Sequence, residues 1–277
     1  MKFRLNQETN EKSNKDSWTT LNTTFINFRE DFEMASFNRS TAYVMICLAV
    51  LFGGGSLMAF LLFLLTGSPE LISLNLHAGE VLWWDAGLSI AFFIQHSGMI
   101  RRSFRQRLAH FLPKEYEGAA YAIVSGIFLF AVIVLWQKSF PVFTVSRGVF
   151  RWLFYIAYLL SLIGFIWGVR ALKVFDPYGL RPILGRLRGR EPRPLALTIR
   201  GPYRWVRHPL YLFMTLMIWS CPDLTGDRLL FNSLWTIWIV IGSILEERDL
   251  VSEFGDAYRE YQRKVPMLIP RRLRPIE

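Results

Sequence analysis

The residues of this chain best suited to chemistry lie in a basic, aromatic segment and in an acidic pair. The segment reads GPYRWVRHPLY over residues 201–211, and the acidic pair is Glu246 and Glu247. Arginine binds carboxylates, whereas carboxylates bind amines and hydroxyl groups. The two segments together therefore suit a zwitterionic ligand that also carries hydroxyl groups.

Pro209 predicts the start of a helix, because proline is favoured in the first helical turn. His208 then lies near the N-cap and Tyr211 near the third helical position. The N-terminus of such a helix has free N–H groups and a positive dipole end, and Arg204 and Arg207 lie beside it. The segment therefore predicts a binding site for a carboxylate.

The acidic pair follows an apolar run over residues 229–245, and a shorter apolar run covers residues 209–222. We interpret the two runs as an antiparallel helical hairpin, which returns Glu246 and Glu247 to the level of the basic segment. The resulting cavity suits S-adenosylmethionine, whose sulfonium is also favoured near an aromatic face such as Tyr203. In the simpler alternative, the basic groups anchor a spanning helix and the acidic groups form an interfacial ion pair.

His96 is a second candidate for chemistry, because ionisable side chains at membrane depth are often functional. It lies in the apolar run of residues 81–100 and is a candidate general base. The alternative is a polar residue whose hydrogen bonds are satisfied inside a helix bundle.

Phe254, Tyr258 and Tyr261 are spaced as i, i+4 and i+7, which predicts one face of a C-terminal helix. This face suits either aromatic anchoring at the membrane interface or a lid that closes the cofactor pocket from the cytosol. The sequence leaves both roles open.

Long apolar runs supply the elements that position these residues. The chain is 52% hydrophobic yet carries a formal net charge of +10, and its apolar residues gather into runs between charged stretches. A spanning helix needs about 20 mostly apolar residues. Residues 41–65, 118–137 and 152–169 contain no charged side chain, and the run around His96 is a fourth span. We predict an all-α polytopic membrane bundle with a C-terminal helical hairpin and a cytoplasmic cofactor pocket.

Lys and Arg are concentrated in alternate loops, which predicts the orientation of the bundle. Residues 101–114 contain five of them and residues 170–207 contain ten, whereas residues 66–80 contain none. We therefore expect an even number of crossings, both termini in the cytoplasm, and membrane lipids as partners of the basic loop.

The composition divides the chain into three parts. Residues 1–40 form a polar cytoplasmic tail or an interfacial helix, residues 41–172 a four-helix transmembrane scaffold, and residues 173–277 the basic loop, hairpin and C-terminal tail of the site. Cys47 and Cys221 lie in apolar segments, where we expect small core residues and no metal ligands. We also expect no nucleic-acid partner.

Two stretches carry a resemblance to a known family. GPYRWVRHPLY and EERDLVSEFGDAYREYQRKVPMLIP resemble the C-terminal signature of the isoprenylcysteine carboxyl methyltransferase and phospholipid methyltransferase superfamily of membrane enzymes. The shared features are an RHP-x-Y element, a paired Glu and an FG-x-x-Y-x-x-Y-x-x-x-VP tail. The resemblance implies an S-adenosylmethionine pocket that lies under the hairpin and opens to the cytosol.

A further resemblance indicates one branch of that superfamily. QHSGMIRRSFRQRL, residues 95–108, is similar to the HS-x-M element of the bacterial branch that contains methanethiol S-methyltransferase and NnrU-like proteins, and DLTGDRLLF and VPMLIP also resemble the methanethiol enzyme. This implies methyl transfer to a small thiol in a bacterial cytoplasmic membrane. The alternatives are a prenylated carboxylate or lipid acceptor, or a non-catalytic NnrU-like protein.

The superfamily pattern implies roles for individual residues. Cofactor-binding roles are implied for Tyr203, Arg204, Arg207, His208, Pro209, Tyr211, Glu246 and Glu247. The candidates for the catalytic step are Arg207, Glu247 and His96, the last as a possible base for the thiol. Phe213 stands where the superfamily often has Gly, which leaves the helix packing beside the pocket open.

Overall fold

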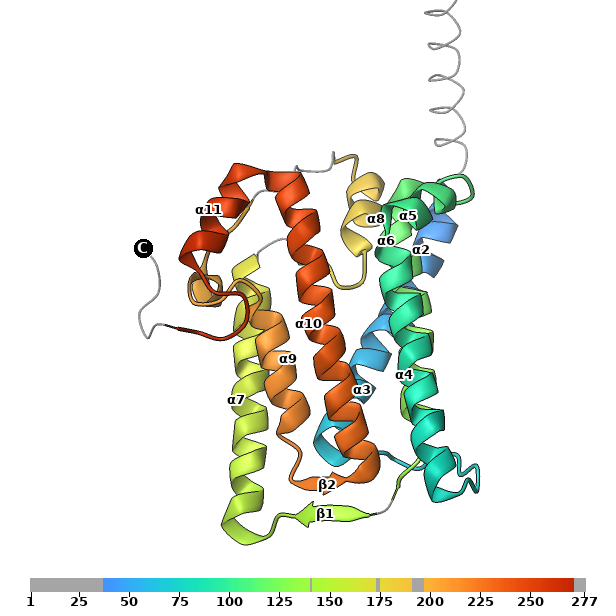
Figure 1. Cartoon of the computed structure of the whole chain (residues 1–277). Coiled ribbons are helices and arrows are strands. Elements are labelled where there is room, and N and C mark those ends of the chain that lie inside the picture. Colours follow the sequence, from blue (N-terminus) through green and yellow to red (C-terminus); the bar gives the residue numbers. More distant parts are fainter. Residues whose placement is uncertain (1–36, 140, 173–174, 191–196, 272–277) are drawn as a thin grey trace, which may run out of the picture.

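The computed structural model describes residues 37–139, 141–172, 175–190 and 197–271, so most of the predicted N-terminal tail lies outside the described residues. Within these ranges the chain is mainly helical, and its long helices stand side by side in one bundle (Figure 1). The helices before the basic loop are α2 (Arg39–Leu48), η1 (Ala49–Gly54), α3 (Gly55–Thr66), α4 (Ala78–Ile100), α5 (Arg102–Leu108), η2 (Lys114–Tyr116), α6 (Glu117–Leu135) and α7 (Gly148–Leu172). The later ones are α8 (Leu180–Leu187), η3 (Gly201–Arg204), α9 (Pro209–Trp219), α10 (Gly226–Phe254) and α11 (Asp256–Lys264).

Four helical stretches are long and apolar enough to cross a membrane. They are Arg39–Thr66, Lys114–Leu135, Gly148–Leu172 and Gly226–Phe254. Helix α4 has 23 residues but contains Glu80, Asp85 and His96, which lower its hydropathy below that of these four. Helix α9 has only 11 residues and rises about 16 Å, roughly half of a hydrocarbon core.

Helices α9 and α10 follow one another and are in contact, and α9 packs against α7. Glycines on α7 accept bulky side chains of α9: a Cβ at Gly164 would lie 2.3 Å from the Phe213 ring, and one at Gly168 would lie 2.7 Å from Leu210. Phe213 therefore lies close to α7 because Gly164 has no side chain.

The end of the bundle away from the basic segments contains a short two-stranded sheet that the sequence analysis did not predict. Strand β1 (Val142–Val145) pairs antiparallel with β2 (Asp223–Thr225). Beside it, buried Asp227 accepts hydrogen bonds from the Trp136 indole (3.2 Å) and the Ser139 amide (3.0 Å). These bonds join the end of α6 to the start of α10.

Arg228 completes this polar connection. Its guanidinium is buried and donates hydrogen bonds to the carbonyls of Phe63 (2.9 Å) and Leu64. Carbonyls in the last turn of a helix have no partner within the helix, so Arg228 caps α3 from α10.

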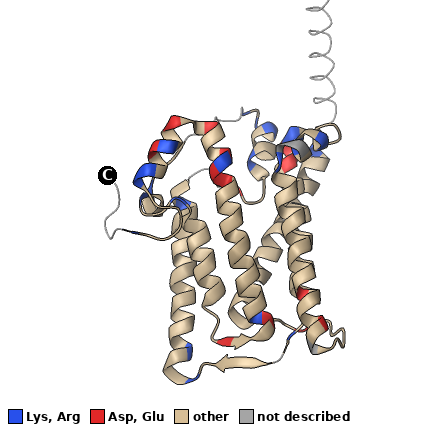
Figure 2. Cartoon of the chain, in the orientation of Figure 1, with Lys and Arg blue, Asp and Glu red and all other residues tan. Residues whose placement is uncertain are grey.

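Charged residues gather at the opposite end of the bundle. Figure 2 shows Lys and Arg concentrated where α5, α8, α11 and the end of α10 lie, and few at the end that carries the sheet. The start of α2 lies at the same charged end (Figure 1).

Cys47 differs from its expected place in the core. It is exposed on the outer surface of α2, whereas Cys221 is half-buried. The outer surface of a membrane bundle is itself apolar, so burial of a small apolar side chain is not required there.

Candidate functional site

Arg207 and Glu247 meet across the hairpin in a bidentate ion pair. The Arg207 Nε lies 2.6 Å from Glu247 Oε1, and Nη2 lies 2.8 Å from Oε2. The side chains are only 10% and 11% exposed. Charge-assisted, bidentate bonds in a buried setting fix both position and orientation, so this pair sets the spacing between the start of α9 and the end of α10.

Glu247 accepts three further hydrogen bonds. They come from His208 Nε2 (2.9 Å), the Tyr258 hydroxyl (3.1 Å) and Gln262 Nε2 (2.6 Å). Both carboxylate oxygens are therefore engaged by protein donors. This arrangement satisfies the juxtaposition expected from the hairpin: the basic segment and the acidic pair share one site.

The segment after α11 closes the site through backbone contacts. The Arg207 and His208 amides donate to the carbonyls of Pro266 (2.9 Å) and Met267 (3.1 Å). Arg207 Nη1 also donates to the carbonyls of Gln262 (3.1 Å) and Val265. The amides of the two residues that precede α9 are thus satisfied by the C-terminal segment.

Tyr258 and Tyr261 are buried, at 2% and 5% exposure, and pack against protein rather than against lipid. The Tyr261 hydroxyl donates to the Tyr203 carbonyl at 2.6 Å. Burial raises the pKa of Tyr258, and the Glu247 carboxylate raises it further, so the hydroxyl stays protonated and donates. Phe254 belongs to α10 instead of to the same helix, because Gly255 adopts a φ of 57° and separates α10 from α11.

Gln262 is a site residue that the sequence analysis missed. It lies four residues after Tyr258 on α11, so the two side chains share a helix face and both reach Glu247. That spacing is the signal in the sequence that points to Gln262.

Glu246 has a different environment from Glu247. Its side chain is 45% exposed, and Oε2 lies 3.7 Å from His208 Nδ1. The His208 ring also stacks on Tyr211, with centroids 5.5 Å apart. The acidic pair therefore has one inward member that holds the protein together and one accessible member.

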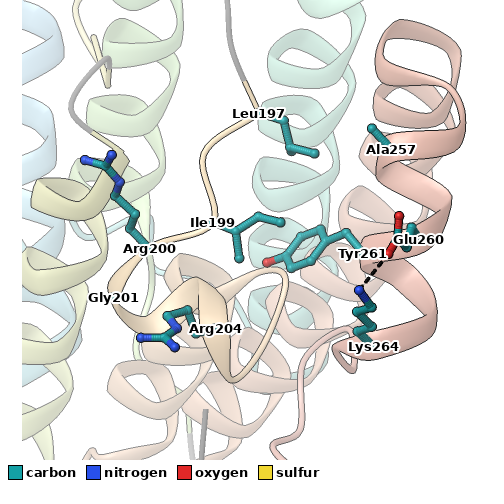
Figure 3. Close-up of a pocket in the computed structure, with 9 residues that line it drawn as sticks. All are labelled: Leu197, Ile199, Arg200, Gly201, Arg204, Ala257, Glu260, Tyr261 and Lys264. Carbon is teal, nitrogen blue, oxygen red and sulfur yellow. Dashed lines mark hydrogen bonds and ion pairs between the residues drawn. The ribbon is translucent and has the colours of Figure 1, made fainter. Parts of the chain in front are cut away.

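A hollow of about 550 Å³ lies next to this cluster, between residues 197–204 and α11 (Figure 3). Its floor includes Leu197 and Ile199, and Arg204 is the predicted cofactor residue that lines it. Tyr261 forms one wall and links the hollow to Tyr203. A concave site of this size, with an apolar floor and charged groups around it, has the dimensions of a small-molecule site.

His96 lies on another helix and has a different partner. The Tyr121 hydroxyl of α6 is 2.9 Å from His96 Nε2 and 3.1 Å from Nδ1. Phe92 stacks on the imidazole with ring centroids 5.1 Å apart. The expected hydrogen bond inside the bundle is therefore present, and a catalytic role for His96 stays a prediction.

Known proteins resemble this chain over most of its length. A methanethiol S-methyltransferase of Pseudomonas sp. (strain GM41(2012)) is 35% identical over 240 residues, which cover 78% of this chain and 89% of that protein. The chain belongs to the methanethiol S-methyltransferase family. The resemblance to the methanethiol branch is thereby confirmed.

Other members of the methanethiol S-methyltransferase family show similar agreement. The protein of Crocosphaera subtropica (strain ATCC 51142 / BH68) is 34% identical over 187 residues, covering 67% of this chain and 73% of that protein. Nurim from Bos taurus is more distant, at 25% identity over 183 residues, covering 61% and 68% of the two chains. No protein-family model and no solved structure matches the chain.

Proposed function

We propose that this protein is a membrane S-adenosylmethionine-dependent methyltransferase that methylates a small thiol such as methanethiol to a thioether. The observation that carries the proposal is the direct contact of Arg207 and His208 with Glu247, in a chain whose relatives are named methanethiol S-methyltransferases. Basic and acidic groups meet at one small site, as a zwitterionic methyl donor requires.

The predicted cofactor residues divide into two groups by their surroundings. Arg207, His208 and Glu247 are mutually bonded and hold the frame, and Pro209 starts the helix that carries it. The cofactor's polar groups would be held by the second group, which is Tyr203, Arg204, Tyr211 and Glu246. Half-exposed Glu246 suits an amine or ribose hydroxyls, and tyrosine faces suit a sulfonium.

S-adenosylmethionine supplies a methyl group that is already activated as a sulfonium, so the protein mainly aligns donor and acceptor and excludes water. The Arg207–Glu247 pair contributes to this alignment by fixing the loop before α9. A thiol is a poor nucleophile until it loses its proton, and His96 is the proposed base.

We place the bundle in the bacterial cytoplasmic membrane with its Lys- and Arg-rich end in the cytosol. The four apolar helices, the charge distribution in Figure 2 and the positive-inside tendency support this orientation. Helix α10 continues for seven residues beyond Glu247, so the site lies about two helical turns before the end of this helix. At this depth a small acceptor dissolved in the bilayer would reach it.

In the deciding experiment, the purified full chain is incubated with labelled S-adenosylmethionine. Methanethiol, a prenylcysteine or a phospholipid is added as the methyl acceptor. We expect label in dimethyl sulfide and a loss of at least tenfold in Glu246→Gln. Asp223→Asn, which alters an exposed ion pair with Arg151 near the sheet, is the matched control and should keep full activity. Label in prenylcysteine or lipid instead would refute the acceptor, and binding without any transfer would refute the enzyme.

A further inference from the structure

The His96 imidazole is held from α6 by a single hydroxyl. Tyr121 Oη lies within hydrogen-bonding distance of both ring nitrogens, and Phe92 covers one ring face. A neutral imidazole has one N–H donor and one nitrogen that accepts a proton. A hydroxyl that accepts from the imidazole N–H can therefore hold the ring in place while the lone pair of the other nitrogen is left to take a proton.

Further polar and aromatic contacts lie in the cofactor motif. Tyr211 stacks on His208 with ring centroids 5.5 Å apart, and Glu246 Oε2 lies 3.7 Å from His208 Nδ1. Glu246 is half-exposed at the charged end of the bundle. Next to His96, Gln95 of α4 donates to the Ser125 hydroxyl of α6 at 3.2 Å, so these two helices are joined by two neighbouring polar contacts.

Open space lies beside this group on α10. Trp238 stacks on Phe93 with centroids 4.7 Å apart, and both helices run toward the charged end from that contact. One turn further, α4 presents His96 and α10 presents Gly242. A Cβ at Gly242 would meet no atom within 4 Å, so side-chain packing leaves this position open.

We propose that the acceptor thiol is held beside Gly242, where His96, positioned by Tyr121, takes its proton. The proposal rests on the proposed thiol methyltransferase activity. The Phe93–Trp238 stack forms the floor of the acceptor position, since thiol sulfur makes favourable contacts with aromatic rings.

The step balances without a further reagent. The acceptor S–H bond breaks and its proton passes to a His96 nitrogen. The acceptor sulfur bonds the methyl carbon while the bond from that carbon to the donor sulfonium breaks and its electron pair stays on the donor sulfur. One proton is released per methyl group transferred, when His96 returns to its neutral form.

Thiols of different acidity test the proton transfer. The full chain, Tyr121→Phe and His96→Gln would be assayed with a weakly acidic alkanethiol and with an acidic thiol that is ionised at the assay pH. We expect kcat to fall about tenfold in Tyr121→Phe and about a hundredfold in His96→Gln for the weak acid, and by less than threefold for the ionised thiol. Equal losses for both thiols, or none, would overturn the proposal.

Matched controls separate this role from general damage. Tyr158→Phe removes another buried hydroxyl, which donates to the Leu61 carbonyl at 2.7 Å, and should change neither thiol's rate. Equilibrium binding of S-adenosylhomocysteine should be unchanged in every variant. A wild-type chain that methylates no thiol would refute the proposed function itself, whereas an active wild type with acidity-independent losses would refute only this inference.

Filling the space tests the acceptor position. Gly242→Val should raise the KM for the thiol at least tenfold and weaken thiol binding measured by tryptophan fluorescence without the methyl donor. S-adenosylhomocysteine affinity should stay the same. Gly87→Val, at another glycine of the bundle with no atom near its Cβ position, is the control. Unchanged thiol binding in Gly242→Val, or an equal loss of S-adenosylhomocysteine binding, would place the acceptor elsewhere.

Discussion

Glu247 receives hydrogen bonds from Arg207, His208, Tyr258 and Gln262, while its neighbour Glu246 faces an accessible region. Adjacent positions on a helix point about 100° apart, so two identical side chains meet different surroundings. A carboxylate with both oxygens engaged by protein donors is suited to holding the site. The exposed carboxylate is suited to a ligand.

Substitution of Arg207 alone, and of Arg207 together with Glu247, should separate the contribution of this ion pair to stability from its contribution to ligand binding. Arg207→Met leaves the Glu247 carboxylate without its charge partner, and we expect a loss of about 3 kcal/mol in unfolding free energy. Arg207→Met with Glu247→Leu should recover part of this stability but not S-adenosylhomocysteine binding. Thermal unfolding in detergent and equilibrium binding are the measurements, and strictly additive stability losses would contradict a direct partnership.

At the scale of elements, the position of α9 depends on α7. Short α9 carries the basic segment, and Gly164 and Gly168 let it approach α7 closely. The identity of α9 as a helix follows from Pro209 and the apolar residues after it, which is local information. The helix against which α9 packs is decided by side-chain volumes on α7, about 50 residues earlier in the chain. The contact that Phe213 makes was therefore not predictable from the motif.

A larger residue at Gly164, alone and together with a smaller residue at Phe213, tests this contact. Gly164→Ala places a methyl group against the Phe213 ring, and we expect a loss of about 1–3 kcal/mol together with weaker S-adenosylhomocysteine binding, because α9 must move. Gly164→Ala with Phe213→Ala should recover both. Gly87→Ala is the control, and unfolding with ligand titration is the measurement. Failure of the second substitution to rescue would show that the two residues do not share this contact.

At the scale of the whole molecule, the charge distribution sets one end of the bundle apart from the other. The other end is joined by Asp227, Arg228 and a short sheet, which connect α3, α6 and α10. The site and these connections therefore lie at opposite ends of the bundle. The arrangement suits a protein that binds a charged cofactor from one side of a membrane.

Single cysteines should report this orientation. With Cys47 and Cys221 replaced by alanine, Ser73→Cys lies in the connection between α3 and α4, and Ala109→Cys follows α5 at the charged end. A membrane-impermeant maleimide applied to intact bacterial cells should label residue 73 at once and residue 109 only after the membrane is opened. Labelling of residue 109 in intact cells would reverse the proposed orientation.

The amino-acid sequence by itself determined the apolar helices, the helix start at Pro209 and the hairpin that returns the acidic pair, because these depend on local composition and on residues near one another in the chain. Family membership also followed from short motifs. Only the tertiary structure decided which glutamate turns inward, that Gln262 holds it, and that Tyr121 faces His96. These contacts depend on how helices rotate and pack against one another, and side chains distant in sequence settle that packing together.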